Sequence, residues 1–227
     1  MQMPYNIYTV IQGGTLSAFL KNLKKARLNS DRVELRADSI RNFKVDGIKM
    51  LKINSPSHSI FTYRHIKEGG LFKGDVKEQR NILKEAFAYS FSCIDVSLGN
   101  SIIEELNLKE RKKLLVSYHE YKVTPTIEKL KGILNKMRKE SPAVIKIATM
   151  VNTPKDIFVL TDLLKEKKKN EKLIVIGMGE MGKLTRIMFP TMGSYLTYAS
   201  MEGEKIAPGL MNQKEMESVY NIITKSK

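Results

Sequence analysis

The sequence predicts an α/β fold, a (β/α)8 TIM barrel formed as a single domain over residues 1–227. Short apolar runs alternate with amphipathic helical patterns from one end of the chain to the other, and that order is typical of a parallel α/β fold. Eight such runs in 227 residues suit an eight-stranded barrel. No Gly/Ser-rich linker and no shift in composition divides the chain, so we expect one domain. A doubly wound open sheet is the structural alternative.

Eight apolar segments have the length of strands, and amphipathic segments lie between them. The predicted strands lie near 5–10, 32–37, 58–64, 93–98, 113–119, 143–149, 173–178 and 195–200. The clearest helical patterns lie at 14–28, 75–91, 125–140, 154–169 and 213–225. Because proline suits the first turn of a helix, Thr124-Pro125-Thr126 and Thr153-Pro154-Lys155 predict the starts of two helices.

The alternation of side chains in five consecutive strands favours the barrel over the open sheet. Successive residues of a strand point to opposite faces, so polar residues two apart share a face. Late in each strand, one face carries polar groups: Glu34 and Arg36, Thr62 and Arg64, Asp95 and Ser97, Ser117 and His119, and Lys146. In a barrel this face points inward at the carboxyl ends of the strands, where active sites of the fold lie. An open sheet covered by helices on both faces would bury these charges in apolar layers.

Lys146 stands in the apolar run Ala143–Ala148. An unpaired ammonium is costly in such surroundings, which favours the neutral amine. A neutral amine can attack a ketone and form a Schiff base, whose protonated form withdraws electrons from the adjacent carbon. The alternative is a structural lysine that is ion-paired with a neighbouring acid.

His119 is the candidate for proton transfer, because its side chain titrates near neutrality and shares the predicted barrel mouth with Lys146. The other two histidines are His58, expected to be structural, and His65, which could line the mouth of a site. Glu68 lies just past the third strand, where a carboxylate could hold the imidazole in one tautomer. The alternative for Glu68 is an ordinary loop glutamate. No two histidines have metal-ligand spacing, so no metal site is expected.

Three arginines are candidates for binding a substrate carboxylate through paired hydrogen bonds: Arg36, Arg64 and Arg186. The alternative for each is a salt bridge to Glu34, Asp38 or another acid.

The segment 177–182 matches the pattern G-x-G-x-x-G of dinucleotide-binding turns. The match is weak, because it lies far from the N-terminus and no acidic residue ends a strand about twenty residues later. We therefore interpret these glycines as a tight strand-to-helix turn.

Composition limits the compartment and the partners. The net charge is +15, but the basic residues are scattered and no ladder of aromatic and basic residues for nucleic-acid stacking is present. A single cysteine, Cys93, excludes an internal disulfide and favours a reducing cytoplasm. No apolar run reaches the length of a membrane span, and the N-terminus lacks the pattern of a secretory signal. We expect no membrane partner.

Taken together, these residues resemble the type I 3-dehydroquinate dehydratases of the shikimate pathway. The matching segments run in family order from about residue 31 to 209. They are Val33–Asp38, Phe61–Arg64, Glu68–Gly70, Val116–Tyr121, Thr124-Pro125, Ile145–Ala148, Gly177–Gly179 with Gly182, Thr185-Arg186, Gly193-Ser194 and Ala207–Gly209. The Ser-Tyr-His segment and the Lys-Ile-Ala segment, about 27 residues apart, are specific as a pair. The family fold is the barrel that the alternation predicts separately.

The resemblance implies a hydro-lyase that converts 3-dehydroquinate to 3-dehydroshikimate and water, in aromatic amino acid biosynthesis. Lys146 would form an imine with the ketone, and His119, oriented by Glu68, would take a proton from the adjacent carbon and return it to the departing hydroxyl. Arg186 would bind the substrate carboxylate. Hydroxyls and neighbouring charges would be held by Glu34, Arg36 and Arg64. No metal or organic cofactor is implied, because the lysine serves as the electron sink.

The sequence departs from the family pattern at two places. The late loop usually reads Ser-Ala-Pro-Gly-Gln, and its serine and glutamine contact substrate as the loop closes. Here Ile206 and Leu210 replace them, although Ala207–Gly209 keeps the frame of the loop. The fourth strand carries Ser97 where an acidic residue is common. We expect weaker substrate affinity, altered closure or a changed substrate.

Two other interpretations of the function stay open. One is a different Schiff-base barrel enzyme, such as a class I aldolase-like protein, whose substrate suits Ile206 and Leu210. The other, from a different class, is a basic nucleic-acid-binding barrel. The retention of four residues together argues against it: Glu68, His119, Lys146 and Arg186. The oligomeric state is left open by the sequence, with a homodimer among the alternatives.

Overall fold

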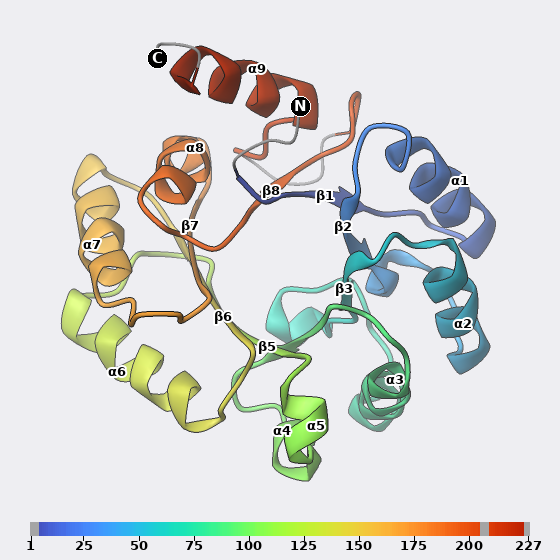
Figure 1. Ribbon diagram of the computed structural model, residues 1–227. Coiled ribbons are helices and arrows are strands. Elements are labelled where there is room, and N and C mark those ends of the chain that lie inside the picture. The colour runs from blue at the N-terminus through green and yellow to red at the C-terminus, as the bar shows by residue number, and fades with distance from the viewer. Residues whose placement is uncertain (1–4, 205–208, 225–227) are drawn as a thin grey trace.

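A computed structural model describes residues 5–204 and 209–224. Eight parallel strands form a nearly closed barrel, and the helices lie outside it (Figure 1). The strands are β1 (Ile7–Ile11), β2 (Arg32–Arg36), β3 (His58–Thr62), β4 (Cys93–Ser97), β5 (Leu114–Glu120), β6 (Val144–Met150), β7 (Leu173–Met178) and β8 (Thr197–Ala199). The larger helices are α1 (Leu16–Ala26), α2 (Val45–Asn54), α3 (Val76–Ala88), α6 (Ile127–Lys139), α7 (Pro154–Lys165), α8 (Lys183–Thr191) and α9 (Gln213–Thr224). Shorter helices are α4 (Ile102–Glu105), α5 (Leu108–Arg111) and the 3₁₀ turns η1 (Ala37–Ser39) and η2 (Ile66–Glu68).

The order of the strands confirms the barrel and excludes the doubly wound sheet. The hydrogen-bonded order is β7-β6-β5-β4-β3-β2-β1-β8, so β1 pairs with both β2 and β8. The segment before β8 also reaches β7, because the amide of Tyr195 donates to the carbonyl of Leu173 at 2.9 Å. Each predicted strand lies within two residues of the observed one at either end.

Helix starts follow the local chemistry of the sequence. At α7, Thr153 is the N-cap, Pro154 is the first helical residue and Asp156 completes a capping box. At α6, however, the cap is Thr126, whose hydroxyl accepts from the amide of Lys129. Pro125 therefore precedes the helix instead of lying in its first turn, and the predicted start there is too early.

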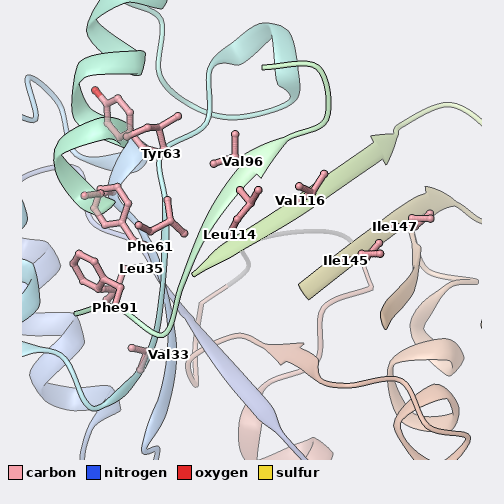
Figure 2. Packing of buried hydrophobic residues seen from close by; sticks show 14 of the residues in the cluster. Val33, Leu35, Phe61, Tyr63, Phe91, Val96, Leu114, Val116, Ile145 and Ile147 are labelled. Atoms are coloured by element: carbon pink, nitrogen blue, oxygen red, sulfur yellow. The ribbon is translucent and has the colours of Figure 1, made fainter. Parts of the chain in front are cut away.

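Apolar side chains form two layers, one on each side of the barrel wall. The outward-facing residues of β2 to β6 belong to one cluster with apolar residues of the helices. Figure 2 shows Val33, Leu35, Phe61, Val116 and Ile147 of this cluster. The inward-facing apolar residues fill the barrel: Tyr8, Val10, Ile60, Cys93, Leu115, Val144, Ala148, Ile174, Ile176 and Tyr198. This filling leaves only the carboxyl end of the barrel for polar groups.

No helix in the described ranges is long and apolar enough to span a membrane.

Candidate active site

A cavity of about 250 Å³ opens at the carboxyl end of the barrel. Its polar lining includes Glu34 on β2, His119 on β5, Lys146 on β6 and Arg186 on α8. Apolar side chains from β1, β6 and β7 complete the wall: Val10, Ala148, Ile176 and Met178. Six of the sequence-predicted candidates thus meet in one place: Glu34, Arg36, Arg64, His119, Lys146 and Arg186.

Lys146 lies on the floor of this cavity, between two carboxylates. Its Nζ is 3.4 Å from Oδ2 of Asp95 and 3.6 Å from Oε1 of Glu34, and Lys146 is 6% exposed. The premise that this amine is unpaired is therefore wrong. The iminium of a Schiff base on Lys146 would carry its positive charge at this atom, between the two carboxylates.

Asp95 is a site residue that the sequence reasoning missed. Its Oδ1 accepts from Nη2 of Arg64 at 2.5 Å and from Oγ of Ser117 at 2.6 Å. Burial by itself would raise the pKa of this carboxyl, but Arg64 and then Lys146 outweigh burial and hold the pKa below its usual range. The signal was present, because Asp95 lies on the polar face of the predicted fourth strand.

Arg64 fixes the position of His119. Its Nη1 lies 2.9 Å from Nε2 and 3.1 Å from Nδ1 of the imidazole. Since a guanidinium can only donate, at least one of these two ring nitrogens must accept and therefore carries no proton. Burial, and then the positive charges of Arg64 and Lys146, keep the pKa of His119 well below its usual range. His119 is thus a neutral imidazole that can take up a proton.

This neutral imidazole predicts the acid limb of the pH profile. Because the pKa of His119 is lowered, activity that needs its unprotonated form should persist as pH falls through about 6.5, the ordinary value for histidine. Activity should decline only at lower pH, where the folded-state histidine at last binds a proton. The measurement is kcat/KM between about pH 4 and 8. A half-maximal point at or above 6.5 that is lost in His119→Asn would contradict the prediction.

The structure does not bring Glu68 to His119 as expected. Oε2 of Glu68 accepts from Nε2 of Gln79 at 2.9 Å, and its Oε1 accepts from Nδ2 of Asn100 at 3.2 Å. The link to the histidine is indirect. The ring of Tyr121 stacks on that of His119, with centroids 5.8 Å apart and planes 13° apart, and its hydroxyl donates to the backbone carbonyl of Glu68 at 3.3 Å.

The three candidate arginines differ in their partners. Arg36 forms a two-point pair with Asp38, with Nε–Oδ1 at 2.9 Å and Nη2–Oδ2 at 2.7 Å, so the salt-bridge alternative holds for it. Arg64 forms an ion pair with Asp95 and also donates to the hydroxyl of Ser117. Arg186 is 6% exposed, and its Nε has no hydrogen-bond partner within 5–204 and 209–224. Burial lowers the pKa of Arg186 to about 10. Of the three, this buried cation is the one that forms no ion pair with the residues that the structure describes.

A glycine turn between β7 and α8 positions Arg186, as the turn interpretation predicts. Gly182 lies so close to Gly177 that a Cβ on it would be 2.4 Å from the Gly177 carbonyl carbon. The hydroxyl of Thr185 accepts from the amide of Gly177 at 2.8 Å and donates to the carbonyl of Gly182 at 2.7 Å. The first turn of α8 is thereby tied to the end of β7, with Arg186 beside the cavity.

The other two histidines lie outside the site. His65 is buried, its Nδ1 accepts from the amide of Lys67 at 3.1 Å, and its Nε2 donates to the carbonyl of Gly74 at 3.0 Å. It holds the loop after β3 and does not line the cavity. His58 is exposed at the opposite end of β3. No group of three acidic, histidine or cysteine side chains suited to a metal ion occurs in the described part of the chain.

The family model for type I 3-dehydroquinase matches residues 7–227. The chain belongs to the type I 3-dehydroquinase family. The 3-dehydroquinate dehydratase of Coxiella burnetii is 35% identical over 215 residues, which cover 94% of this chain and 91% of that protein. The enzyme of the same name from Methanococcus maripaludis is 34% identical over 213 residues, covering 92% and 95%.

Solved structures of type I 3-dehydroquinases agree with the barrel. The enzyme from Clostridium difficile, solved with covalently modified comenic acid, has a TM-score of 0.86 at 26% identity and covers 100% of this chain and 94% of its own. The 3-dehydroquinate dehydratase from Aquifex aeolicus has a TM-score of 0.83 at 25% identity, covering 97% and 99%.

Two of the departures from the 3-dehydroquinase pattern can be placed in the structure, and one cannot. Leu210 lines the cavity and packs against the inward-facing apolar layer. Ser97 is half-buried at the end of β4. Ile206 lies outside the described residues. The apolar replacement at 210 therefore faces the space that a substrate would occupy.

Proposed function

We propose that this chain dehydrates 3-dehydroquinate to 3-dehydroshikimate through an imine on Lys146, with His119 as the proton-transfer residue. The observation that supports this proposal is the arrangement of charged groups around Lys146 in the cavity. There an amine 3.4 and 3.6 Å from two carboxylates shares the site with a neutral imidazole. The whole chain would act as one catalytic domain.

Nζ of Lys146 gives up a proton and attacks the substrate ketone, and the return of that proton as water leaves gives an iminium. Asp95 and Glu34 stabilise the positive nitrogen. His119 removes a proton from the carbon next to the iminium carbon. The electron pair of that C–H bond forms a carbon–carbon double bond, and the π pair of the C=N bond moves to the nitrogen to give an enamine. The enamine then expels the hydroxyl on the following carbon, which His119 protonates so that it leaves as water. Hydrolysis of the remaining imine releases the enone and restores Lys146.

The other predicted site residues fit roles in binding and orientation. Arg186 has no anionic partner in 5–204 and 209–224 and suits the substrate carboxylate. Glu34 accepts from the hydroxyl of Thr62 at 3.0 Å and lines the cavity, so it can also accept from a substrate hydroxyl. Arg36 and Arg64 would add positive charge at the wall. Glu68 would orient His119 only through the stacked ring of Tyr121.

The test of the function is the absorbance of the conjugated enone when purified protein meets 3-dehydroquinate. A rise in absorbance that saturates with substrate supports the proposal. A flat trace from folded protein would exclude dehydroquinate and favour a different Schiff-base substrate. Retention on nucleic acid that weakens steeply with salt would instead favour the nucleic-acid-binding alternative.

Leu210 provides a prediction about substrate affinity. In Leu210→Gln, an amide replaces an apolar group at the cavity wall, and one good hydrogen bond to dehydroquinate is worth about 1 kcal/mol. We expect KM to fall roughly five-fold with little change in kcat. Steady-state kinetics with dehydroquinate check this, and Leu210→Met, similar in volume and apolar, is the control. A weaker kcat without a gain in affinity would mean that the leucine meets an apolar part of a different substrate or shields the imine.

We further place the protein in the cytoplasm, where the buried, unpaired Cys93 stays reduced. A homodimer stays a prediction that light scattering can check.

A further inference from the structure

Tyr198 on β8 carries a hydroxyl that has no hydrogen-bond partner among the described residues. The side chain points into the barrel and lines the same cavity as Lys146 and Arg186. It is 3% exposed, and its hydroxyl makes no hydrogen bond to any residue in the described part of the chain. A buried hydroxyl without a partner costs free energy, so native proteins retain few of them. A ligand that enters the cavity can supply the missing acceptor.

The position of the ring places this hydroxyl beside the reacting lysine. Nζ of Lys146 lies 4.2 Å from the centroid of the Tyr198 ring, a cation–π distance. A substrate joined to Nζ therefore lies next to Tyr198. Because the iminium keeps the positive charge at Nζ, the contact with the ring persists after the imine forms.

The hydroxyl keeps its proton and is therefore able to donate a hydrogen bond. Burial, followed by the nearby carboxylates of Glu34 and Asp95, raises the pKa of Tyr198 well above its ordinary value. Nε of Arg186 is the other buried donor of this cavity without a partner in the described residues. Two such donors suit a carboxylate, which has about four acceptor positions and would be left poorly satisfied by one donor. Glu34, an acceptor, suits substrate hydroxyls instead.

We propose that the hydroxyl of Tyr198 donates a hydrogen bond to the substrate carboxylate, beside Arg186, while the substrate is held on Lys146. The proposal rests on the proposed function and adds a substrate-binding residue to it. Tyr198 thereby helps to select an anionic ketone over a neutral one.

The experiment is Tyr198→Phe, which removes the oxygen and keeps the ring over Nζ. We expect KM for dehydroquinate to rise about ten-fold or more, since hydrogen bonds to charged groups are among the stronger ones. The value of kcat should change little. Thermal stability without substrate should not fall, because the deleted hydroxyl makes no hydrogen bond to the described part of the chain. The matched control is Tyr8→Phe, another inward-facing tyrosine, whose ring lies 6.5 Å from that of Tyr198 and which does not line the cavity.

A second measurement tests which substrate group the hydroxyl binds. An analogue with hydrogen in place of the carboxylate is trapped on Lys146 by borohydride, and the half-saturating concentration is compared for wild type and Tyr198→Phe. Equal values for this analogue, together with the raised KM for dehydroquinate, support the proposal. An unchanged KM in Tyr198→Phe, or the same loss with the analogue, would overturn it. In both cases the trapped adduct on Lys146 would still form. Failure of the proposed function is distinct, because wild type would then give neither enone nor adduct.

Discussion

Replacing Lys146 will abolish turnover of dehydroquinate and the adduct that borohydride traps. In Lys146→Arg the positive charge between Asp95 and Glu34 is kept, but a guanidinium cannot form an imine. We expect kcat to fall by roughly 10⁴-fold or more, the scale seen when a covalent nucleophile is removed. Enone absorbance measures the rate, and peptide mapping after borohydride treatment locates the adduct.

The choice of substitution matters because Lys146 is buried between two acids. Lys146→Ala would leave two buried carboxylates less compensated, and the loss of fold could then mimic loss of chemistry. Lys172→Arg is the matched control, because Lys172 also lies over a tyrosine ring, 5.1 Å from the centroid of Tyr195, but does not line the cavity. An adduct on another lysine, or full activity in Lys146→Arg, would show that the proposed nucleophile is wrong.

Replacing His119 will slow the reaction without preventing imine formation at Lys146. His119→Ala removes the group that moves protons, and we expect kcat to fall by about 10²- to 10⁴-fold. Borohydride should still trap substrate on Lys146, because the two carboxylates at its Nζ stay in place. Rapid mixing with substrate, followed by mass spectrometry, measures the adduct separately from turnover.

The remaining histidines serve as controls for this prediction. His58→Ala changes an exposed side chain at the far end of β3 and should leave both kcat and KM unchanged. His65→Ala removes two hydrogen bonds from the loop that carries Glu68, so its effect should show as lower thermal stability. Equal turnover in His119→Ala and His58→Ala would remove the proton-transfer assignment.

Much of this site could be predicted from the order of residues in the strands. Side chains of a strand alternate between its two faces, so a polar residue points inward when the apolar residues beside it point outward. This alternation places four residues on the inward face: Glu34, Asp95, His119 and Lys146. Parallel strands also end at one edge, which places late polar residues at one mouth. These two rules depend on local geometry alone, and the sequence therefore determined the barrel and the face on which the chemistry lies.

Partners within the site were decided only by the tertiary structure. Lys146 is ion-paired, Glu68 accepts hydrogen bonds from Gln79 and Asn100, and Arg36 forms an ion pair with Asp38. For Glu68 the observed partners differ from the predicted one. For Lys146 and Arg36 the structure shows the ion pair that the sequence left open as an alternative. The sequence likewise could not show that the hydroxyl of Tyr198 has no partner within the described ranges.

The physical reason is that hydrogen bonds and ion pairs need contact within about 3 to 4 Å. Side chains that share a face of the barrel can still differ by several ångströms in height and in rotamer. The nearest donor to a carboxylate therefore depends on how neighbouring strands are staggered and how the loops fold over them. Residue order fixes which way a side chain points, whereas only the packed barrel fixes which atoms it touches.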